Sequence, residues 1–398
     1  MRVLFISNLY PPHFLGGYEL LCEEVCRGFV ARGHAATVLT STHGAAGDGD
    51  VAGSRVLRRL RLTVPFERAY CYAPLNEHRA ARENAAATRA LLAAERFDAV
   101  FLWSQLRLSL GPARAVDGAG LPAVWTFNDA NILGYRLRPP GPRPASWLRW
   151  LACATALRHT TLEGLPIRFG AAISRQLRDD LAEGGFDTSH VEVVYQGIRT
   201  VDFPPRGEPG AVGVPMRVLY TGQLNRYKGV HTLVDAVGRF AAARGKDSIS
   251  VTVAGDGDPA YVAELKNAAA ATSAAFRFTG RLPRHELPAL YRAHDVFVFP
   301  SIWREPFGLT HLEAMCSGLP VVSTADGGQG EFLRDGDNAL VFPKEDAGAL
   351  AERLGRLADG AELARRVAAS GRETVLRDFD IERYIGDLER LVARAAGQ

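Results

Sequence analysis

Two glutamates stand eight residues apart in a segment suited to binding a sugar. The stretch PSIWREPFGLTHLEAMCSGLPVVST follows a predicted strand, with Glu305 in a loop, Gly308 at the turn into a helix and Glu313 on that helix. Carboxylates accept hydrogen bonds from hydroxyl groups, and backbone N–H groups at a helix start attract negative charge. One carboxylate can therefore meet a sugar and the other a ribose. Two solvated helix glutamates would not explain the Pro-Phe-Gly turn directly after Glu305.

A lysine in a second loop suits a phosphate group. In VLYTGQLNRYKGVHTLVDA a strand ends at Thr221–Gly222, Arg226 and Lys228 lie in the loop, and a helix begins near Gly229. A cation beside a glycine-flanked helix start favours a phosphate or diphosphate. Lys228 is one of only 4 lysines, beside 43 arginines, which indicates a need for a compact charge. The pattern GxxxxGK[ST] is absent, which argues against a nucleoside triphosphatase.

Two glycine-rich segments also suit close contact with a ligand. Gly16 and Gly17 lie between the first predicted strand and its helix, where exposed N–H groups favour an anion, although a tight turn is the simpler alternative. This is not the GxGxxG fingerprint of nicotinamide or flavin proteins. Gly327, Gly328 and Gly330 form a loop after another predicted strand, where we expect the backbone to approach a ligand.

Strands and helices alternate along the whole chain, which predicts parallel sheets covered by helices on both faces. A stretch with four prolines and three glycines, Pro204–Pro215, interrupts the alternation and is the best linker candidate. The fold class is therefore α/β, with two Rossmann-like doubly wound domains and a predicted substrate cleft between them. The predicted strands are Val3–Ser7, Val38–Thr40, Val100–Trp103, Ala123–Phe127, Ala171–Ser174, Val191–Tyr195, Val218–Tyr220, Ser250–Ala254, Phe276–Thr279, Val296–Pro300, Val321–Ser323 and Ala339–Phe342.

Composition excludes several other classes of protein. The 398 residues are 47% hydrophobic and 23% charged, which is typical of globular chains, and the net charge of +3 is too small to indicate nucleic-acid binding. No apolar run has the length of a membrane span. The five cysteines are scattered without a CxxC or Cys/His cluster, which predicts reduced thiols in the cytoplasm and no metal site.

Together these segments resemble the retaining nucleotide-sugar glycosyltransferases of family 4, which have the GT-B fold. The most specific match is the family's Glu–seven residues–Glu pattern, present as EPFGLTHLE. Gly16–Gly17 resembles the family's GG loop, and Gly222–Gly229 its G-R-L-x-x-x-K-G donor loop. Gln196–Arg199 resembles its N-G-I-D segment, and Gly255–Asp258 its G-D-G-P turn.

The resemblance implies a domain organisation and a reaction. Residues 1–203 would bind the acceptor and residues 204–380 the donor, with a last helix at 381–398 crossing back to the first domain. The enzyme would move a hexosyl unit from a nucleotide diphosphate sugar, a UDP-sugar rather than a GDP-sugar, to a hydroxyl of a glycan, lipid-linked or small-molecule acceptor. We expect no metal, no separate cofactor and no nucleic-acid partner. We expect a cytoplasmic protein with at most peripheral contact at the inner face of the membrane.

Site residues follow from the same resemblance. Catalytic roles fall to Glu305, Lys228 and Asn128, and acceptor contacts to His13, Asn128 and Asp129. The implied donor-binding residues are Gly16, Gly17, Gly222, Gln223, Arg226, Lys228, Gly255, Glu305, Pro306, Phe307, Gly308, Leu309, Thr310 and Glu313.

The sequence departs from the family at two site positions. Gln223 stands where the family has an arginine, a change for which Arg226 would compensate, and Asn128 stands where it often has a histidine. These departures leave open a non-catalytic nucleotide-sugar-binding partner subunit. A second alternative is a GT-B-fold nucleotide-sugar epimerase, against which the EPFGLTHLE segment argues. Acceptor specificity would lie in the loops around 60–80 and 130–160, the first of which is basic enough to touch a lipid-linked acceptor or a membrane surface.

Overall fold

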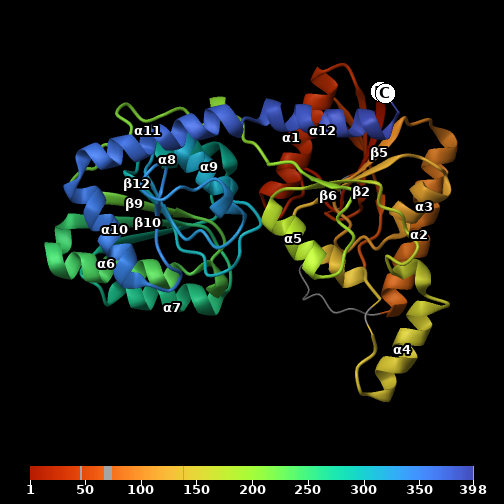
Figure 1. Ribbon diagram of the computed structural model, residues 1–398, viewed down its shortest axis with the longest axis horizontal. Coiled ribbons are helices and arrows are strands. Elements are labelled where there is room, and N and C mark those ends of the chain that lie inside the picture. Colours follow the sequence, from red (N-terminus) through yellow and green to blue (C-terminus); the bar gives the residue numbers. More distant parts are fainter. Residues whose placement is uncertain (45–46, 67–73, 138, 398) are drawn as a thin grey trace. The chain divides into compact units, whose positions relative to one another are not determined.

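The computed structural model describes residues 1–44, 47–66, 74–137 and 139–397, which form two compact units. Unit 1 comprises Met1–Val194 and Ile385–Gln398, and unit 2 comprises Tyr195–Tyr384. Figure 1 shows that each unit is built from strands and surrounding helices. No helix among the described residues is long and apolar enough to cross a bilayer.

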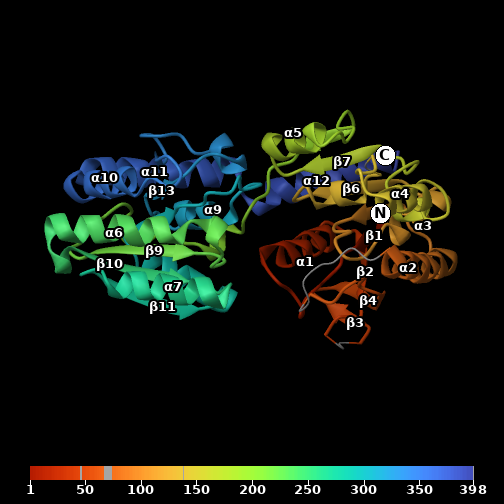
Figure 2. The ribbon, with the colours of Figure 1, turned by 90° about the horizontal axis from the view of Figure 1, so that it is seen from below.

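Unit 1 contains an eight-stranded sheet in the order β3-β4-β2-β1-β5-β6-β7-β8. Figure 2 shows β3, β4, β2, β1, β6 and β7 in this order from bottom to top. All neighbours pair in parallel except β3 with β4. The central strands β1 and β5 are buried, because their apolar runs face helices on both sides. The strands are β1 Arg2–Ile6, β2 Ala35–Ser41, β3 Gly49–Val51, β4 Ser54–Leu60, β5 Ala99–Leu102, β6 Ala123–Phe127, β7 Phe169–Ala172 and β8 Val191–Val193, and the helices are α1 Gly17–Ala31, α2 Pro74–Ala94, α3 Gly111–Gly118, α4 Pro144–Ala154 and α5 Arg175–Glu183.

Unit 2 contains a six-stranded parallel sheet in the order β11-β10-β9-β12-β13-β14. This is the strand order of a Rossmann sheet, so the chain reverses direction across the sheet between β9 and β12. The predicted strands are all present, with ends shifted by one or two residues. They are β9 Met216–Thr221, β10 Ile249–Ala254, β11 Ala275–Gly280, β12 Val296–Phe299, β13 Val321–Ser323 and β14 Leu340–Val341, and the helices are α6 Val230–Arg244, α7 Pro259–Ala270, α8 Leu287–Arg292, α9 Leu309–Cys316, α10 Ala347–Asp359 and α11 Ala361–Asp378. A last helix, α12 Ile381–Ala395, begins in unit 2 and continues from Ile385 in unit 1.

The predicted linker Pro204–Pro215 is wrong, because this stretch is packed into unit 2. Arg206 donates to the buried carboxylate of Asp295 at 2.7 Å. Gly210 has no space for a side chain, since a Cβ there would lie 2.5 Å from the carbonyl oxygen of Ala364. The chain instead passes between units at 194/195 and 384/385, rather than at the expected 203/204 and 380/381. The ring of Tyr195 already packs beside Phe307, 5.9 Å between centroids.

The C-terminal part of α12 belongs to unit 1. Its Glu389 accepts hydrogen bonds from Arg32 and His34, each at 2.7 Å, at the end of α1 and in the turn that follows it. Gly28 of α1 makes room for Ile385, because a Cβ at that glycine would lie 2.4 Å from the isoleucine side chain. The last helix therefore completes the packing around α1.

Candidate functional site

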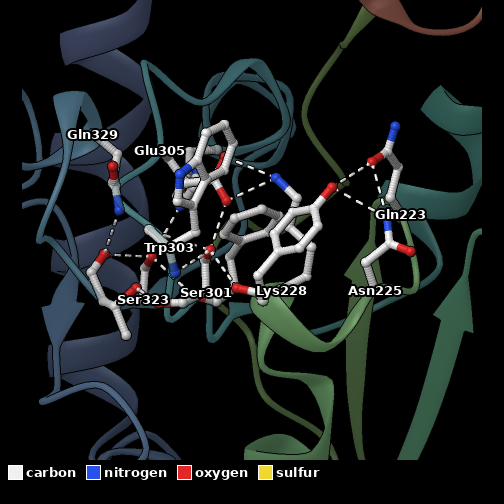
Figure 3. A network of polar contacts seen from close by, with 12 residues as sticks. Gln223, Asn225, Lys228, Ser301, Trp303, Glu305, Ser323 and Gln329 are labelled. Atoms are coloured by element: carbon white, nitrogen blue, oxygen red, sulfur yellow. Dashed lines mark hydrogen bonds and ion pairs between the residues drawn. The ribbon is translucent and has the colours of Figure 1, made fainter. Parts of the chain in front are cut away.

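A buried ion pair joins the two loops that sequence analysis singled out in unit 2. The Lys228 ammonium lies 2.7 and 2.8 Å from the two carboxylate oxygens of Glu305, and their side chains are only 12% and 8% exposed. Lys228 ends the 3₁₀ turn after β9, and Glu305 lies in the loop after β12. Because β9 and β12 are neighbours, both loops lie outside the carboxyl ends of the strands at the point of reversal, where open α/β sheets bind ligands. Figure 3 shows the pair.

Two hydrogen bonds fix Glu305, one from a hydroxyl group to its carboxylate and one from a backbone N–H to its carbonyl oxygen. Ser301 Oγ donates to its Oε1 at 2.6 Å, and the Gly328 N–H donates to its carbonyl oxygen at 2.7 Å. A Cβ at Gly327 would lie 2.3 Å from that same carbonyl oxygen. The sequence suggests that these glycines allow a ligand to approach the backbone closely. In the structure the backbone of Glu305 lies against them instead.

Aromatic rings and amides surround Lys228. Its ammonium lies 5.0 Å from the centroid of the Trp303 ring and 5.4 Å from that of Tyr227. The Tyr227 hydroxyl donates to Gln223 Oε1 at 3.0 Å and accepts from Asn225 at 3.1 Å. Figure 3 shows Gln223 and Asn225 on one side of Lys228 and Trp303 on the other. The amide of Gln223 thus orients Tyr227 and brings no charge to the position where the resemblance implies an arginine.

Arg226 does not join the Lys228–Glu305 pair. It is 63% exposed, forms an ion pair with Glu264 and lies 5.3 Å from the centroid of the Tyr261 ring. Its charge is therefore partly neutralised on the outer side of the loop.

Glu313 is buried on α9 rather than solvated. Its Oε2 accepts from the Tyr291 hydroxyl at 2.9 Å, and its Oε1 lies 3.9 Å from Arg284. The Tyr291 hydroxyl also contacts Thr221 Oγ1 at 2.9 Å, at the end of β9. Burial raises the pKa of Glu313, although Arg284 and the hydrogen bond from Tyr291 act in the opposite direction.

The turn between the two glutamates is built around an aromatic core. The Phe307 ring packs against Tyr195, Phe332 and Phe379, with centroids 5.3 to 5.9 Å apart. Gly308, after the half-buried Pro306, has φ 132° and precedes α9, whose first residues are Leu309 and Thr310. The side chain of Phe307 therefore belongs to the core, which leaves only its backbone for a donor contact.

His311, which the sequence pattern does not single out, packs against the residues of this turn. Its ring is completely buried, with Nε2 2.9 Å from Ser323 Oγ and its centroid 4.7 Å from that of Phe299. Burial lowers the pKa of His311 to about 3. It therefore stays neutral and serves the packing of α9 against β12 and β13.

The glycine-rich turns after β9 and β10 touch each other. A Cβ at Gly255 would lie 1.8 Å from the carbonyl oxygen of Gly222, and the two residues have φ near 150°. Asp258 caps α7 by accepting from the Ala260 N–H at 2.9 Å, and Asp256 accepts from the N–H of Gly257. The carboxylates of Asp256 and Asp258 thus accept backbone hydrogen bonds. Among the described residues, no group of three or more His, Cys, Asp and Glu side chains could hold a metal ion.

Unit 1 has its own cavity of about 100 Å³ at the carboxyl ends of β1, β5 and β6. Asn8 follows β1, Trp103 follows β5, and Asn128 and Asp129 follow β6. Burial raises the pKa of Asp129, although its Oδ1 accepts from the Asn131 N–H at 2.8 Å. The carboxylate is thus both a turn cap and a lining group of a polar cavity.

The first glycine loop and His13 lie differently from expectation. The Gly16 N–H donates to Glu19 Oε2 at 3.1 Å, so a carboxylate of α1 itself occupies this helix start, and Gly17 is the first residue of the helix. His13 packs against His43, with 6.1 Å between ring centroids, and it is not among the residues that line the cavity with Asn128.

Two family models match the chain one after the other. The model described as Glycosyltransferase Family 4 matches residues 15–201, and the one described as Glycosyl transferases group 1 matches residues 207–374. Among curated proteins, the chain is 29% identical to glycogen synthase of Mycobacterium tuberculosis over 235 residues, covering 58% of this chain and 56% of the relative. It is 33% identical to alpha-maltose-1-phosphate synthase of Mycolicibacterium smegmatis, covering 52% and 58%. The chain thus matches little more than half the length of these relatives.

Solved structures resemble the chain over nearly its whole length. The Anabaena protein HepE in complex with UDP and glucose has a TM-score of 0.71 at 20% identity, covering 99% of both chains. Sucrose-phosphate synthase from Thermosynechococcus elongatus has a TM-score of 0.73 at 20% identity, covering 99% of this chain and 98% of the other. At these identities the likeness shows the fold.

Proposed function

The chain belongs to glycosyltransferase family 4 and has the GT-B fold, and we propose that it transfers a hexosyl unit from a nucleotide diphosphate sugar to a hydroxyl group with retention of anomeric configuration. The observation that carries this proposal is the buried Lys228–Glu305 pair at the carboxyl edge of the unit 2 sheet. When the sugar separates from the diphosphate, the ammonium can stabilise the diphosphate and the carboxylate can contact the sugar.

The cation would act on the leaving group. As the glycosidic bond breaks, negative charge grows on the diphosphate, and stabilising charge where it develops is usually the largest catalytic contribution. The Lys228 ammonium has three donors, of which two contact Glu305, so the third can reach a phosphate oxygen. Arg226 would add to the potential only after release from Glu264.

Glu305 would hold hydroxyls of the transferring sugar while the ring becomes oxocarbenium-like. Its backbone is fixed by Gly328 and its carboxylate by Ser301, so the group is pre-oriented before the donor binds. Glu313 would accept from the ribose through Oε1, because Tyr291 already occupies Oε2. The N–H groups of Phe307–Leu309, at the start of α9, would meet negative charge of the donor.

The acceptor would be bound in the unit 1 cavity. The Asn128 amide and the Asp129 carboxylate can contact hydroxyls there, and an amide cannot act as a base. The Asp129 carboxylate is engaged by the Asn131 N–H. We propose that the departing phosphate oxygen takes the acceptor proton.

The donor would be a UDP-sugar. HepE, which shares this fold, is described in complex with UDP and glucose, which supports uridine as the base of the donor. A screen of uridine, guanosine, thymidine and adenosine diphosphate sugars, with thermal shift and nucleotide release as the two readouts, tests the proposal. We expect a UDP-sugar to raise Tm and to be turned over without added metal. Failure of every donor to bind would overturn it.

Gln223 and Asn128 favour one second candidate, a non-catalytic subunit that binds a nucleotide sugar. Neither side chain carries the charge or basicity that the resemblance implies at its position. A donor that raises Tm but releases no nucleotide with any acceptor would favour this role. An epimerase would instead change the sugar without an acceptor.

A further inference from the structure

The unit 1 cavity is lined by a glutamine whose carbonyl oxygen is buried without a hydrogen-bond partner. Gln105 follows β5, is only 6% exposed and lines the cavity together with Asn128. Its Nε2 donates to the Ser104 carbonyl oxygen at 3.0 Å, which fixes the orientation of the amide. Its Oε1 is buried and has no partner among the residues that the structure describes. Because a buried acceptor that is left unpaired destabilises the folded state, this atom is suited to a ligand that donates.

Other polar groups of the lining narrow the choice of that ligand. The Thr126 hydroxyl donates to the Trp103 carbonyl oxygen at 2.8 Å, so toward a ligand it can only accept. The amides of Asn8 and Asn128 carry donors as well as acceptors. A ligand hydroxyl can donate to Gln105 and accept from an amide, whereas an ammonium group only donates and a carboxylate only accepts. The lining therefore fits hydroxyl groups.

The charges in the lining disfavour an anion. Glu19 and Asp129 are part of it, and none of the described lining residues is a lysine, an arginine or a histidine. One oxygen of each carboxylate accepts from a backbone N–H, that of Gly16 at 3.1 Å and that of Asn131 at 2.8 Å. A ligand carboxylate or phosphate would lose hydration there and meet charges of the same sign.

Aromatic rings form much of the remaining wall. The rings of Tyr18 and Trp103 stack with 5.4 Å between their centroids, and Trp125 and Phe127 also line the cavity. The volume of about 100 Å³ has room for several water-sized groups. Ligand sites commonly combine aromatic walls with a few polar groups that fix orientation. A sugar ring matches this wall, because it has apolar C–H faces and an edge of hydroxyl groups.

We propose that Gln105 determines acceptor specificity: its Oε1 accepts a hydrogen bond from a hydroxyl of an uncharged sugar, and the cavity rejects a sugar ring that carries a carboxylate or a phosphate. Only the role of this sugar as the acceptor rests on the proposed function, since its binding requires no transfer. An amide cannot act as a base, so Gln105 would contribute to acceptor binding and leave donor binding unchanged.

Ligand-observed NMR titrations with the full chain test the binding. The uncharged probes are methyl glucoside, methyl galactoside and methyl mannoside, and the matched anions are the uronates of the same three sugars. We expect at least one uncharged probe to bind roughly tenfold more tightly than its uronate, because the uronate places a charge beside the carboxylates of the lining. Equal affinity for every such pair, or no binding of any uncharged probe, would overturn the proposal.

Gln105→Met keeps the length of the side chain and removes its amide. Loss of one hydrogen bond should weaken binding of the uncharged probe roughly tenfold. Gln176→Met is the matched control, because Gln176 lies on α5, donates to Asp180 at 3.0 Å and is not among the residues that line the cavity. Its probe affinity should equal that of the wild type. A lower Tm in Gln105→Met with unchanged probe affinity would mean that the amide serves only the fold.

Kinetics separate this proposal from the proposed function. Where transfer to the uncharged probe is observed, Gln105→Met should raise the KM for the probe and leave the donor KM unchanged. An increase in the donor KM alone would contradict the assignment. The titrations contain no donor, so a protein that binds the probe but shows no transfer would overturn the transferase proposal and leave the binding site established.

Discussion

Lys228 and Glu305 lie 77 positions apart in the chain, and the ammonium contacts both carboxylate oxygens, at 2.7 and 2.8 Å. With both side chains largely buried, each charge has lost most of its hydration and depends on the other. The pair is therefore part of the fold of unit 2 as well as the proposed site, so stability and activity must be measured together.

Lys228→Met should lower both stability and turnover. Removing one partner of a buried ion pair leaves an uncompensated charge, which costs about 3–5 kcal/mol. Loss of one charge-assisted contact should weaken donor-diphosphate binding by about 1.5–3 kcal/mol. Chemical denaturation and calorimetric titration with the nucleoside diphosphate measure the two effects.

The double variant Lys228→Met/Glu305→Gln is the control for folding. Both charges are gone, so most of the lost stability should return while turnover stays low. Unchanged donor affinity and rate in Lys228→Met would remove the cation from the proposed mechanism.

Gly327→Ala should impair the site without touching a ligand. The added Cβ would lie 2.3 Å from the carbonyl oxygen and 2.5 Å from the backbone nitrogen of Glu305, so the loop that holds the carboxylate must shift. A displacement of this size can reduce the rate by about 100-fold. Gly207→Ala is the matched control, since a Cβ there meets nothing within 4 Å and the residue is exposed. Equal rates for the two variants would show that this packing does not position Glu305.

His311 should make the folded state sensitive to acid. Burial, assisted by the nearby Lys228 charge, lowers its pKa from 6.5 to about 3. Between these values the unfolded chain binds the proton and the folded chain does not. Stability therefore falls as the pH decreases from 6.5 toward 3, by at most about 1.4 kcal/mol per pH unit.

Replacing this histidine isolates its contribution. His311→Gln replaces the imidazole by an amide that can still contact Ser323 Oγ, and it should flatten the stability profile over this window relative to the wild type. Denaturation midpoints at several pH values measure the difference, and parallel profiles for the two proteins would contradict the assignment.

The sequence predicted the separate parts of the site better than their connections. Lys228 and Glu305 were identified from residue type and loop position, but their pairing depends on β12 lying beside β9, which periodicity does not reveal. Most strands were predicted because buried parallel strands are short apolar runs. The strands β3 and β4 were not predicted, since β3 is short and polar and β4 contains three arginines. The stretch Pro204–Pro215 was misread because proline and glycine also occur in packed loops. His311 was not predicted as a core residue, because residue type alone does not show whether a histidine is buried.

Turnover should persist in excess EDTA. Asp256 and Asp258 are engaged by backbone N–H groups, and Lys228 supplies positive charge in the donor loop. The resemblance to family 4 likewise implies no bound metal. Steady-state rates with EDTA, then with added Mg²⁺ or Mn²⁺, check this expectation. A strict requirement for either ion would mean that the diphosphate charge is neutralised by a metal rather than by Lys228.

Glu305→Gln and Glu313→Gln should affect different kinetic constants. If Glu305 contacts the transferring sugar, its interaction strengthens as positive charge builds on the ring, so its loss lowers kcat. If Glu313 contacts only the ribose, it contributes equally in the ground and transition states, so its loss mainly raises the donor KM.

Each glutamine keeps the shape of the glutamate it replaces. Glu313→Gln retains an acceptor for the Tyr291 hydroxyl, whereas Glu305→Gln leaves Lys228 without its counter-charge and should lower Tm. Kinetics at a temperature well below both Tm values, with the donor identified in the screen, separate these effects. A near-native kcat in Glu305→Gln would remove Glu305 from the chemical step and leave its ion pair with Lys228 as a purely structural contact.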